Sequence, residues 1–263
     1  MKRVGYAGAR APTAATLAGV MRAHVAAIPF ENIDVQLGRP TSRALPDIFA
    51  KLVTRRRGGW CYEQNGLLGW ALGELGFAVT PLAGGVMRVT SGDAALGNHL
   101  ALLVDLDDGP WLVDAGFGGS LAAPIRLAAA AHRHAPYDLS LARLTGGYWR
   151  YEERAEGKPF SFDFRAVPAD QALLDAHHAR LQVAPDSSFV LNLVVQRRLG
   201  ERHLSLRGRV LTELDSRGRT AETILADADA LVETLATRFG LDVPEIAECW
   251  PAICARHTDV FAD

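Results

Sequence analysis

The chain has 263 residues, of which 49% are hydrophobic and 22% are charged, and its formal net charge is −2. This composition is ordinary for a globular protein, and the length suffices for one large domain or two to three small lobes. The low net charge, with no basic block longer than Arg55–Arg57, excludes the pattern typical of a nucleic-acid-binding protein.

The three cysteines and the apolar runs bear on the cellular compartment. Cys61, Cys249 and Cys254 are odd in number and unevenly spaced, which is a poor disulfide framework and favours a reducing cytoplasm. Cys249 and Cys254 have no matching second pair, so we expect no metal site. We see no secretory signal, and no apolar run approaches the roughly 20 residues that cross a bilayer. The expectation is a cytoplasmic protein without a membrane or nucleic-acid partner.

Helical patterns fill the first third of the chain. One helix is predicted to begin after Pro12 and to end before Pro29, because proline suits a helix start and stops a helix interior. A second apolar stripe covers Ile48–Val53 and ends at Gly58-Gly59.

A third helix is predicted to start near Cys61 and to end at Gly76. Glycines recur on roughly one face of it, at positions Gly66, Gly69, Gly73 and Gly76. Each interior glycine costs a helix about 1 kcal/mol relative to alanine. We therefore expect this face to pack closely against a neighbouring element.

From residue 79 the pattern becomes short, β-rich and separated by turn residues. The predicted strands are Ala78–Pro81, Gly85–Thr90, His99–Leu106, Pro110–Phe117, Tyr148–Arg154, Pro159–Phe164, Phe189–Arg197 and His203–Leu211. The segment Leu127–Pro136 is predicted to be a surface loop, and Ile224–Phe239 a helix closed by Gly240. The fold class is therefore α+β: helices, then an antiparallel barrel or sheet, then a mixed tail.

A hairpin turn at Asp108-Gly109 brings two polar residues together. His99 opens one strand and Asp114 interrupts the apolar partner strand, so the two side chains should lie within a residue or two of facing each other. An ionised carboxylate in such a strand needs a partner. The pair is interpreted either as a structural hydrogen bond or as part of a catalytic site.

Cys61 has two interpretations, a buried small side chain or a nucleophile. The thiolate is the reactive form of cysteine, and a helix N-terminus or an imidazolium favours it. Gly58 and Gly59 would let the backbone approach a ligand, and Glu63 and Asn65 lie close by in the chain. With a His–Asp pair available as base and orienting group, the nucleophile is the stronger hypothesis.

The stretch "RRGGWCYEQN" resembles the arginine–glycine–glycine–x–cysteine signature of the arylamine N-acetyltransferases. Three other stretches resemble marks of that family in the same order: "IPFENID" (Ile28–Asp34), "GNHLALLV" (Gly97–Val104) and "VDAGFGG" (Val113–Gly119). The late segment "LRGRVL" (Leu206–Leu211) extends the similarity over nearly the whole chain.

The resemblance implies three lobes: a helical bundle over 1–83 that carries the cysteine, a β-barrel with an interdomain segment over 84–190, and an α/β lid over 191–263. It also implies a Cys–His–Asp triad, which falls on Cys61, His99 and Asp114. The implied reaction transfers an acyl group from acetyl-CoA, or a related acyl-CoA, through a Cys61 thioester to the nitrogen of an arylamine or arylhydrazine.

The same triad leaves other functions open. A related amide synthase would close a macrolactam on a carrier-bound polyketide, and a cysteine hydrolase would release the acyl group to water. A binding protein would use the three residues as a buried polar network. The oligomeric state is left open by the sequence.

Secondary site residues follow from the same resemblance. The turn Phe117-Gly118-Gly119 would offer an apolar surface and open N–H groups to the pantetheine arm of CoA. Arg57 and Glu63 would form an ion pair that braces the Cys61 turn, with Asn65 as a further structural support. The aromatic acceptor pocket would be lined by Phe30, Val86 and Phe189. Two departures from the commonest family text, at Gly85 and at Gly97-Asn98, bear on the acceptor side.

Overall fold

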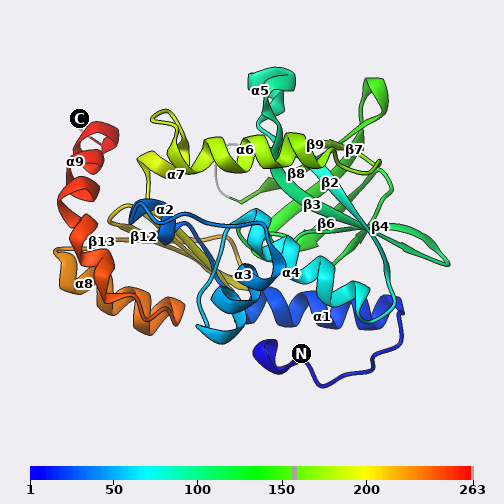
Figure 1. The fold of residues 1–263 in the computed structure, drawn as a ribbon, viewed down its shortest axis with the longest axis horizontal. Helices are drawn as coiled ribbons and strands as arrows, with labels where there is room; N and C mark the ends of the chain where they lie inside the picture. Colours follow the sequence, from blue (N-terminus) through cyan, green and yellow to red (C-terminus); the bar gives the residue numbers. More distant parts are fainter. Residues whose placement is uncertain (156–158, 262–263) are drawn as a thin grey trace.

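The computed structural model describes residues 1–155 and 159–261 of the chain. Its first part is helical, and Figure 1 shows these helices near the N-terminus. Thr13 caps α1 by accepting a hydrogen bond from the Thr16 N–H, and the helix ends before Pro29. The elements are η1 (Lys2–Val4), α1 (Ala14–Ala27), α2 (Ile33–Gln36), α3 (Leu45–Phe49), the π-helical turn η2 (Ala50–Thr54) and α4 (Cys61–Gly73).

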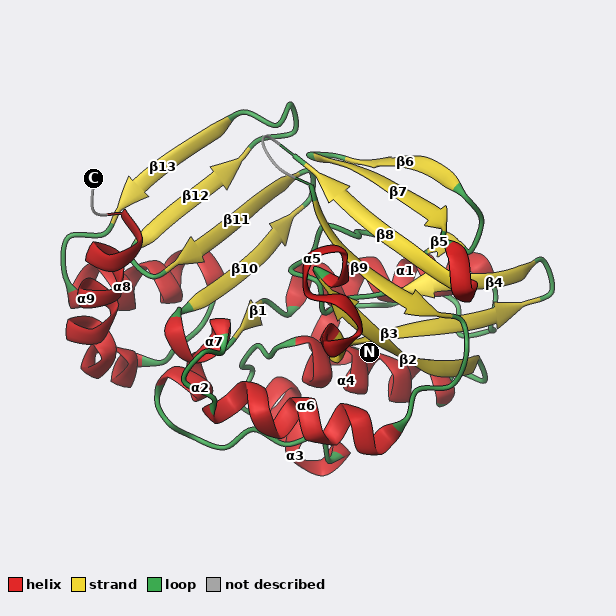
Figure 2. Cartoon of the chain, turned by 90° about the horizontal axis from the view of Figure 1, so that it is seen from above, coloured by secondary structure: helices red, strands yellow, loops and turns green. Residues whose placement is uncertain are grey.

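Eight antiparallel strands form the second part, a curled sheet in the order β5-β4-β3-β2-β9-β8-β7-β6. Within the described residues β5 and β6 are its two edges, so the sheet is a half-barrel (Figure 2). The strands are β2 (Ala78–Val86), β3 (Leu96–Leu106), β4 (Gly109–Val113), β5 (Ile125–Arg126), β6 (Ala130–His134), β7 (Tyr137–Arg143), β8 (Tyr148–Arg154) and β9 (Phe160–Arg165). Short helical turns α5 (Arg88–Ser91), η3 (Gly92–Ala95) and η4 (Thr145–Gly147) connect them.

The third part is a five-stranded antiparallel sheet in the order β1-β10-β11-β12-β13, with helices packed against it on the left of Figures 1 and 2. Helices α6 (Gln171–Val183) and α7 (Ser188–Leu191) lead into it from the half-barrel. Its strands are β1 (Phe30–Glu31), β10 (Val194–Leu199), β11 (Arg202–Arg207), β12 (Val210–Leu214) and β13 (Thr220–Ile224). The helices are α8 (Ala228–Thr234), the π-helical turn η5 (Leu235–Phe239), η6 (Pro244–Cys249) and α9 (Trp250–Phe261).

Two large apolar cores hold these layers together. One lies between α1, α4 and the half-barrel, and it includes Leu17, Leu68, Leu102 and Phe162. The other lies between the C-terminal sheet and its helices and includes Leu204 and Leu231. The alternation of buried and exposed residues along β7, from Tyr137 to Arg143, is typical of a strand with one face on a core.

The glycine face of α4 is in close contact at two positions. A Cβ at Gly66 would lie 3.0 Å from Ile48 Cδ1, and a Cβ at Gly69 would lie 3.3 Å from Leu102 Cδ2. Gly73 has no atom within 4 Å of such a Cβ. The expectation of close packing is therefore confirmed for the middle of α4 and wrong at its end.

Several predicted elements agree with the structure: the first and third helices, β8, and the hairpin of β3 and β4. The strand predicted at Gly85–Thr90 is wrong, since β2 is one strand that ends at Val86. Met87 then adopts a left-handed conformation with φ of 54° and turns the chain into α5. Pro81 lies within β2 before its pairing with β9 begins at Gly84, so the missing N–H of Pro81 breaks no bond to β9.

Other boundaries differ because tertiary pairing overrides local pattern. The predicted loop Leu127–Pro136 contains β6, which pairs only with β7 at the sheet edge. The predicted strand Phe189–Arg197 begins with helix α7, and the predicted strand His203–Leu211 is a hairpin that turns at Gly208, where φ is 58°. Ile224 belongs to β13 rather than to the following helix.

Candidate active site

Cys61 is the first residue of α4, at the helix end whose dipole favours a negative charge. Its side chain is 3% exposed and lies in a small apolar cluster with Trp60 and Tyr62. The Glu63 carboxylate accepts a hydrogen bond from the Trp60 N–H at 3.2 Å, which caps the helix just before the cysteine. The sulfur is thus held at a fixed place in a largely dry environment.

His99 connects Cys61 to Asp114. The pairing of β3 with β4 ends with Val113 opposite Leu102, so His99 and Asp114 lie diagonally across the continuation of the two strands. His99 Nε2 lies 2.7 Å from Asp114 Oδ2, and both residues are 2% exposed. Cys61 interacts with the same ring, and this interaction favours the protonated form of His99. The predicted proximity of the three residues is therefore observed.

The charge state of His99 follows from these contacts. Burial lowers the pKa of the ring, but the charge of Asp114 and the hydrogen bonds with Asp114 and Cys61 outweigh burial and raise that pKa to about 10. The ring is then a cation at neutral pH and donates Nε2–H to the carboxylate. An imidazolium beside a cysteine stabilises the thiolate form.

Asn65 fixes the far oxygen of Asp114 from one helical turn after Cys61. Its Nδ2 donates to Asp114 Oδ1 at 2.7 Å and to the Leu100 carbonyl, and its Oδ1 accepts from the Ala115 N–H at 2.9 Å. The Gly116 N–H donates to the same Asp114 oxygen at 2.7 Å. Asn65 therefore links the helix of the cysteine to the strand of the aspartate, a closer role than the sequence suggested.

Two residues that sequence reasoning missed shape the site directly. A Cβ on Gly116 would lie 2.6 Å from Cys61 Cα, so the chain can pass over the cysteine only with glycine there. The Phe162 ring lies 4.7 Å from the His99 ring, centroid to centroid, and closes one side of it. Gly116 lies within the "VDAGFGG" stretch, so the sequence could have indicated its role in the site. No sequence feature indicated the role of Phe162.

The ion pair predicted between Arg57 and Glu63 is replaced by a buried network. Lys51 Nζ lies 3.0 Å from Glu63 Oε2 and 2.8 Å from Asp34 Oδ2, while Arg57 Nη2 lies 2.9 Å from Glu31 Oε1 and 3.3 Å from Asp34 Oδ1. Burial raises the pKa of Glu63 to about 7, although the charge of Lys51 lowers it. The prediction missed Lys51 because it lies in the preceding helix.

Positions 58 and 59 require glycine for a different reason from the one expected. A side chain on Gly58 would collide with the Pro29 carbonyl and with Glu31, and one on Gly59 would meet Glu63 Oε2 at 2.7 Å. The two glycines therefore let two parts of the chain approach each other rather than a ligand. Gln64 holds the same loop, because its Nε2 donates to the carbonyls of Pro29 and Gly59.

The residues predicted to line the acceptor pocket fall in two places. Phe30 and Phe189 belong to the cluster around Cys61, with ring centroids 6.1 Å apart, and Phe189 also lies 5.4 Å from the Trp60 ring. Val86 packs against the half-barrel core instead, and its N–H donates to Asn98 Oδ1 at 2.8 Å. Phe189 is partly exposed, so the cluster opens on its side.

The turn Phe117-Gly118-Gly119 is close to His99 but is largely covered. The Phe117 and His99 rings lie 5.3 Å apart, and the three turn residues are buried. The Gly118 carbonyl accepts from His203 Nε2 at 2.7 Å, and the Gly119 carbonyl accepts from Arg198 at 2.9 Å. The prediction of an open surface at this turn is therefore wrong, because Arg198 of β10 and His203 of β11 cover it.

The described residues contain neither a metal-binding group nor a membrane-spanning helix. In residues 1–155 and 159–261 there is no group of three His, Cys, Asp or Glu side chains that could hold a metal ion. The helices of the same residues include none long and apolar enough to traverse a bilayer. All three cysteines are free thiols.

Comparison with known proteins gives a consistent result. A family model described as N-acetyltransferase matches residues 13–248. An arylamine N-acetyltransferase of Mycolicibacterium smegmatis is 37% identical over 94% of this chain and 92% of its own length. An isozyme from the pineal gland of Gallus gallus is 30% identical over 91% of both chains.

Solved structures agree with the sequence comparison. The arylamine N-acetyltransferase of Mycobacterium marinum in complex with CoA has a TM-score of 0.86 and 34% identity, covering 98% of this chain and 97% of its own. The enzyme of Salmonella typhimurium has a TM-score of 0.85 and 30% identity, covering 97% of this chain and 96% of its own.

Proposed function

Because the chain belongs to the arylamine N-acetyltransferase family, we propose that it moves the acetyl group of acetyl-CoA to an arylamine through a thioester on Cys61. The related enzyme solved with CoA supports a CoA thioester as the donor. The names of the relatives do not favour a macrolactam-forming amide synthase or a hydrolase.

One observation carries the proposal for the mechanism: the His99 ring touches both Cys61 and Asp114 at the start of α4. A buried thiolate needs a nearby cation, and a buried imidazolium needs a nearby carboxylate. The row Cys61–His99–Asp114 satisfies both needs. It matches the nucleophile, base and orienting group of covalent catalysis.

In the first half of the reaction, the Cys61 thiolate attacks the thioester carbonyl of acetyl-CoA. The tetrahedral intermediate collapses when the bond to the CoA sulfur breaks, and His99 gives its proton to the departing thiolate. The products are free CoA and acetyl-Cys61. One thioester is exchanged for another, so this step is close to energetic balance.

In the second half, the nitrogen of an arylamine attacks the acetyl carbonyl of the thioester. His99, now neutral, takes the proton that the nitrogen loses, and the bond to Cys61 sulfur breaks. The N-acetylated amine leaves and the thiolate–imidazolium pair is restored. Asp114 keeps the ring in the orientation and charge state that both halves need.

Substrate positions follow from the surroundings of the sulfur. Phe30 and Phe189 offer ring faces to an aromatic amine from the cluster that contains Cys61. Phe117 and the two glycines after it lie on the His99 side, where the pantetheine arm would pass.

The test is formation of the acetyl-enzyme in the absence of amine. Wild-type protein mixed with acetyl-CoA is expected to release one equivalent of CoA and to gain one acetyl group by intact mass, and Cys61→Ala is expected to do neither. Its amine acetylation should fall roughly 10⁴-fold or more. Cys249→Ala, which removes a partly exposed free thiol, is the matched control. Acetylation of an arylamine by Cys61→Ala at near the wild-type rate contradicts the proposal.

A further inference from the structure

We propose that the side-chain amides of Asn32 and Gln36 are positioning residues that hold Phe189 in the wall of the acceptor pocket and so determine which amines are used. The inference rests on the proposed function and extends it to acceptor selectivity. Both amides come from the N-terminal part of the chain, whereas Phe189 lies in α7, more than 150 residues later.

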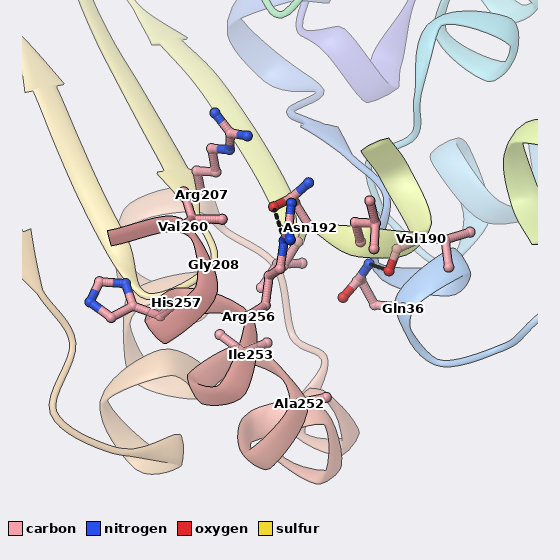
Figure 3. A pocket seen from close by; sticks show the side chains of 12 residues that line it. Gln36, Val190, Asn192, Arg207, Gly208, Ala252, Ile253, Arg256, His257 and Val260 are labelled. Atoms are coloured by element: carbon pink, nitrogen blue, oxygen red, sulfur yellow. Dashed lines mark hydrogen bonds between the residues drawn. The ribbon is translucent and has the colours of Figure 1, made fainter. Parts of the chain in front are cut away.

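Helix α7 has only four residues, so its carbonyls need partners from outside the helix. Asn32 Nδ2 donates to the Phe189 and Asn192 carbonyls, each at 2.8 Å. Gln36 Nε2 donates to the Phe189 carbonyl at 2.6 Å and to the Val190 carbonyl at 3.1 Å. Figure 3 shows the Gln36 side chain directed at Val190. The Phe189 carbonyl therefore has two amide donors from one neighbouring segment.

The side-chain oxygen of Asn32 also has a hydrogen-bond partner. Its Oδ1 accepts from the Val194 N–H at 2.7 Å, and its side chain is 2% exposed. Water therefore has little access to replace these bonds when an amide is lost. The Asn192 carbonyl would lose its donor in a buried place, and the Phe189 carbonyl in a part-buried one.

The position of the α7 backbone determines where the Phe189 ring lies relative to Cys61. The ring packs edge-on against Trp60, the residue before Cys61, and in a tilted arrangement against Phe30, two residues before Asn32. A shift of α7 therefore changes the distance between the ring and the sulfur. Phe189 is partly exposed, so a bound aromatic amine can contact it.

A cavity beside α7 offers room for such a shift. A cavity of about 70 Å³ lies between α7, the β11–β12 turn and α9, and Val190, Leu191 and Ile253 line it (Figure 3). Arg256 of α9 holds the end of α7 from that side through a 3.2 Å hydrogen bond to Asn192 Oδ1. Gln36 also lines this cavity, so without its amide α7 can move into the space.

The experiment uses Gln36→Met, which keeps the size of the side chain and removes the donor. Gln36 is partly exposed at the end of α2, and Gln36→Glu provides a second variant that also cannot donate. Gln171→Met is the control, because the exposed Gln171 bonds Arg43 and not α7. Each variant is assayed separately for CoA release in the first half-reaction and for kcat and KM with small and large arylamines.

Both Gln36 variants are expected to form acetyl-Cys61 within about twofold of the wild-type rate. Their KM for arylamines should rise roughly tenfold, the effect of one or two net hydrogen bonds, and the order of preference between small and large amines should change. Gln171→Met should change neither value. In a Phe189→Ala background, Gln36→Met should have no further effect, because its action passes through that ring.

Three results overturn the inference, two of them specific to Phe189 and amine choice and one general. One is an unchanged amine preference in both Gln36 variants, and the other is the same fold-change with and without Phe189. An equal loss in both half-reactions also counts against it, since this indicates general damage to the fold. If the wild type itself releases no CoA with acetyl-CoA and arylamines, the proposed function has failed, which is a separate outcome.

Discussion

Gly116 lies against Cys61 at a distance that leaves no room for a side chain. A Cβ there would be 2.6 Å from Cys61 Cα, 2.9 Å from Cys61 Cβ and 2.7 Å from Asn65 Nδ2. Because both neighbours belong to the helix that presents the sulfur, any added methyl group displaces the cysteine or the amide that holds Asp114. The constraint is steric, and breaking it would misalign Cys61 relative to His99 and Asp114.

We expect Gly116→Ala to lower the rate of acetyl-enzyme formation at least about 100-fold, since misplacement of a reacting group by about 1 Å has that effect. The unfolding free energy should fall by only about 1–3 kcal/mol, the usual cost of overpacking. Gly73→Ala is the control: it lies in the same helix as Cys61, its Cβ would meet nothing within 4 Å, and activity should be retained. Stopped-flow measurement of CoA release tests both, and a Gly116→Ala enzyme of normal rate would show that the turn yields freely.

What the sequence predicts at this scale depends on how local the contact is. His99 and Asp114 meet across one hairpin, so turn position and strand alternation sufficed to pair them. The bond from Asn65 to Asp114 joins a helix to a strand 49 residues later, and no periodicity reveals it. The network around Glu63 was mispredicted for the same reason, because Lys51 reaches it from another helix.

At the scale of the element, α4 begins over a buried group of charges. Lys51 and Arg57 face Glu31, Asp34 and Glu63, and Glu31 and Glu63 are 0% and 2% exposed. Burial is the main cause that raises the pKa of Glu63 to about 7, from a usual value of 4.5, and Glu31 adds to it. Since the folded state binds this proton more tightly, the stability that Glu63 contributes is complete below about pH 4.5. It is lost as the pH rises through about 7.

Glu63→Gln is expected to remove this pH dependence while keeping an oxygen acceptor for the Trp60 N–H. The unfolding free energy of the variant relative to wild type should therefore rise between pH 5 and pH 7, by on the order of 1 kcal/mol per pH unit. Urea unfolding at a series of pH values measures it, with Glu74→Gln, at the exposed residue that follows the same helix, as control. Parallel curves for wild type and Glu63→Gln would falsify the assignment of the raised pKa to Glu63.

Elements with a strong local pattern were predictable, and elements set by pairing were not. Helix α4 combines apolar residues with a start at Cys61, and β8 carries the aromatic strand formers Tyr148, Trp149 and Tyr151. By contrast, β6 consists of alanine, histidine and arginine, which are poor strand formers, and it is a strand because β7 offers it a hydrogen-bonding edge. Helix α7 is too short for a periodic signal and is held by the amides of Asn32 and Gln36.

At the scale of the whole molecule, the N-terminal and C-terminal parts of the chain are interlocked. Strand β1 leaves the helical part and forms the edge of the C-terminal sheet, with Phe30 opposite Gln196. The stretch Ile28–Asp34 thus supplies a strand, two carboxylates of the buried network and the amide that holds α7. This explains in physical terms why "IPFENID" stood out beside the cysteine signature.

Arg198 makes a second connection between distant parts of the chain, because it joins β10 of the C-terminal sheet to the turn beside His99. The residue is 5% exposed, and its guanidinium donates to the carbonyls of Gly119, Ser120, His134, Ala135 and Gly200. Burial lowers the pKa of Arg198 from its ordinary value. Only a planar group with several fixed N–H donors can serve so many acceptors at once.

We expect Arg198→Met to destabilise the fold by about 3–5 kcal/mol, because several buried carbonyls lose a charged donor together. Arg198→Lys should recover little of this, since an ammonium cannot reach both groups of carbonyls. As the turn at Phe117–Gly119 loosens, the fraction of each variant that stays folded should lose acetyl transfer at low acetyl-CoA more than at saturation. Urea unfolding and a titration with acetyl-CoA measure the two effects, with the exposed Arg202→Met as control. Equal unfolding midpoints for Arg198→Met and Arg202→Met would mean that the two sheets hold together without this guanidinium.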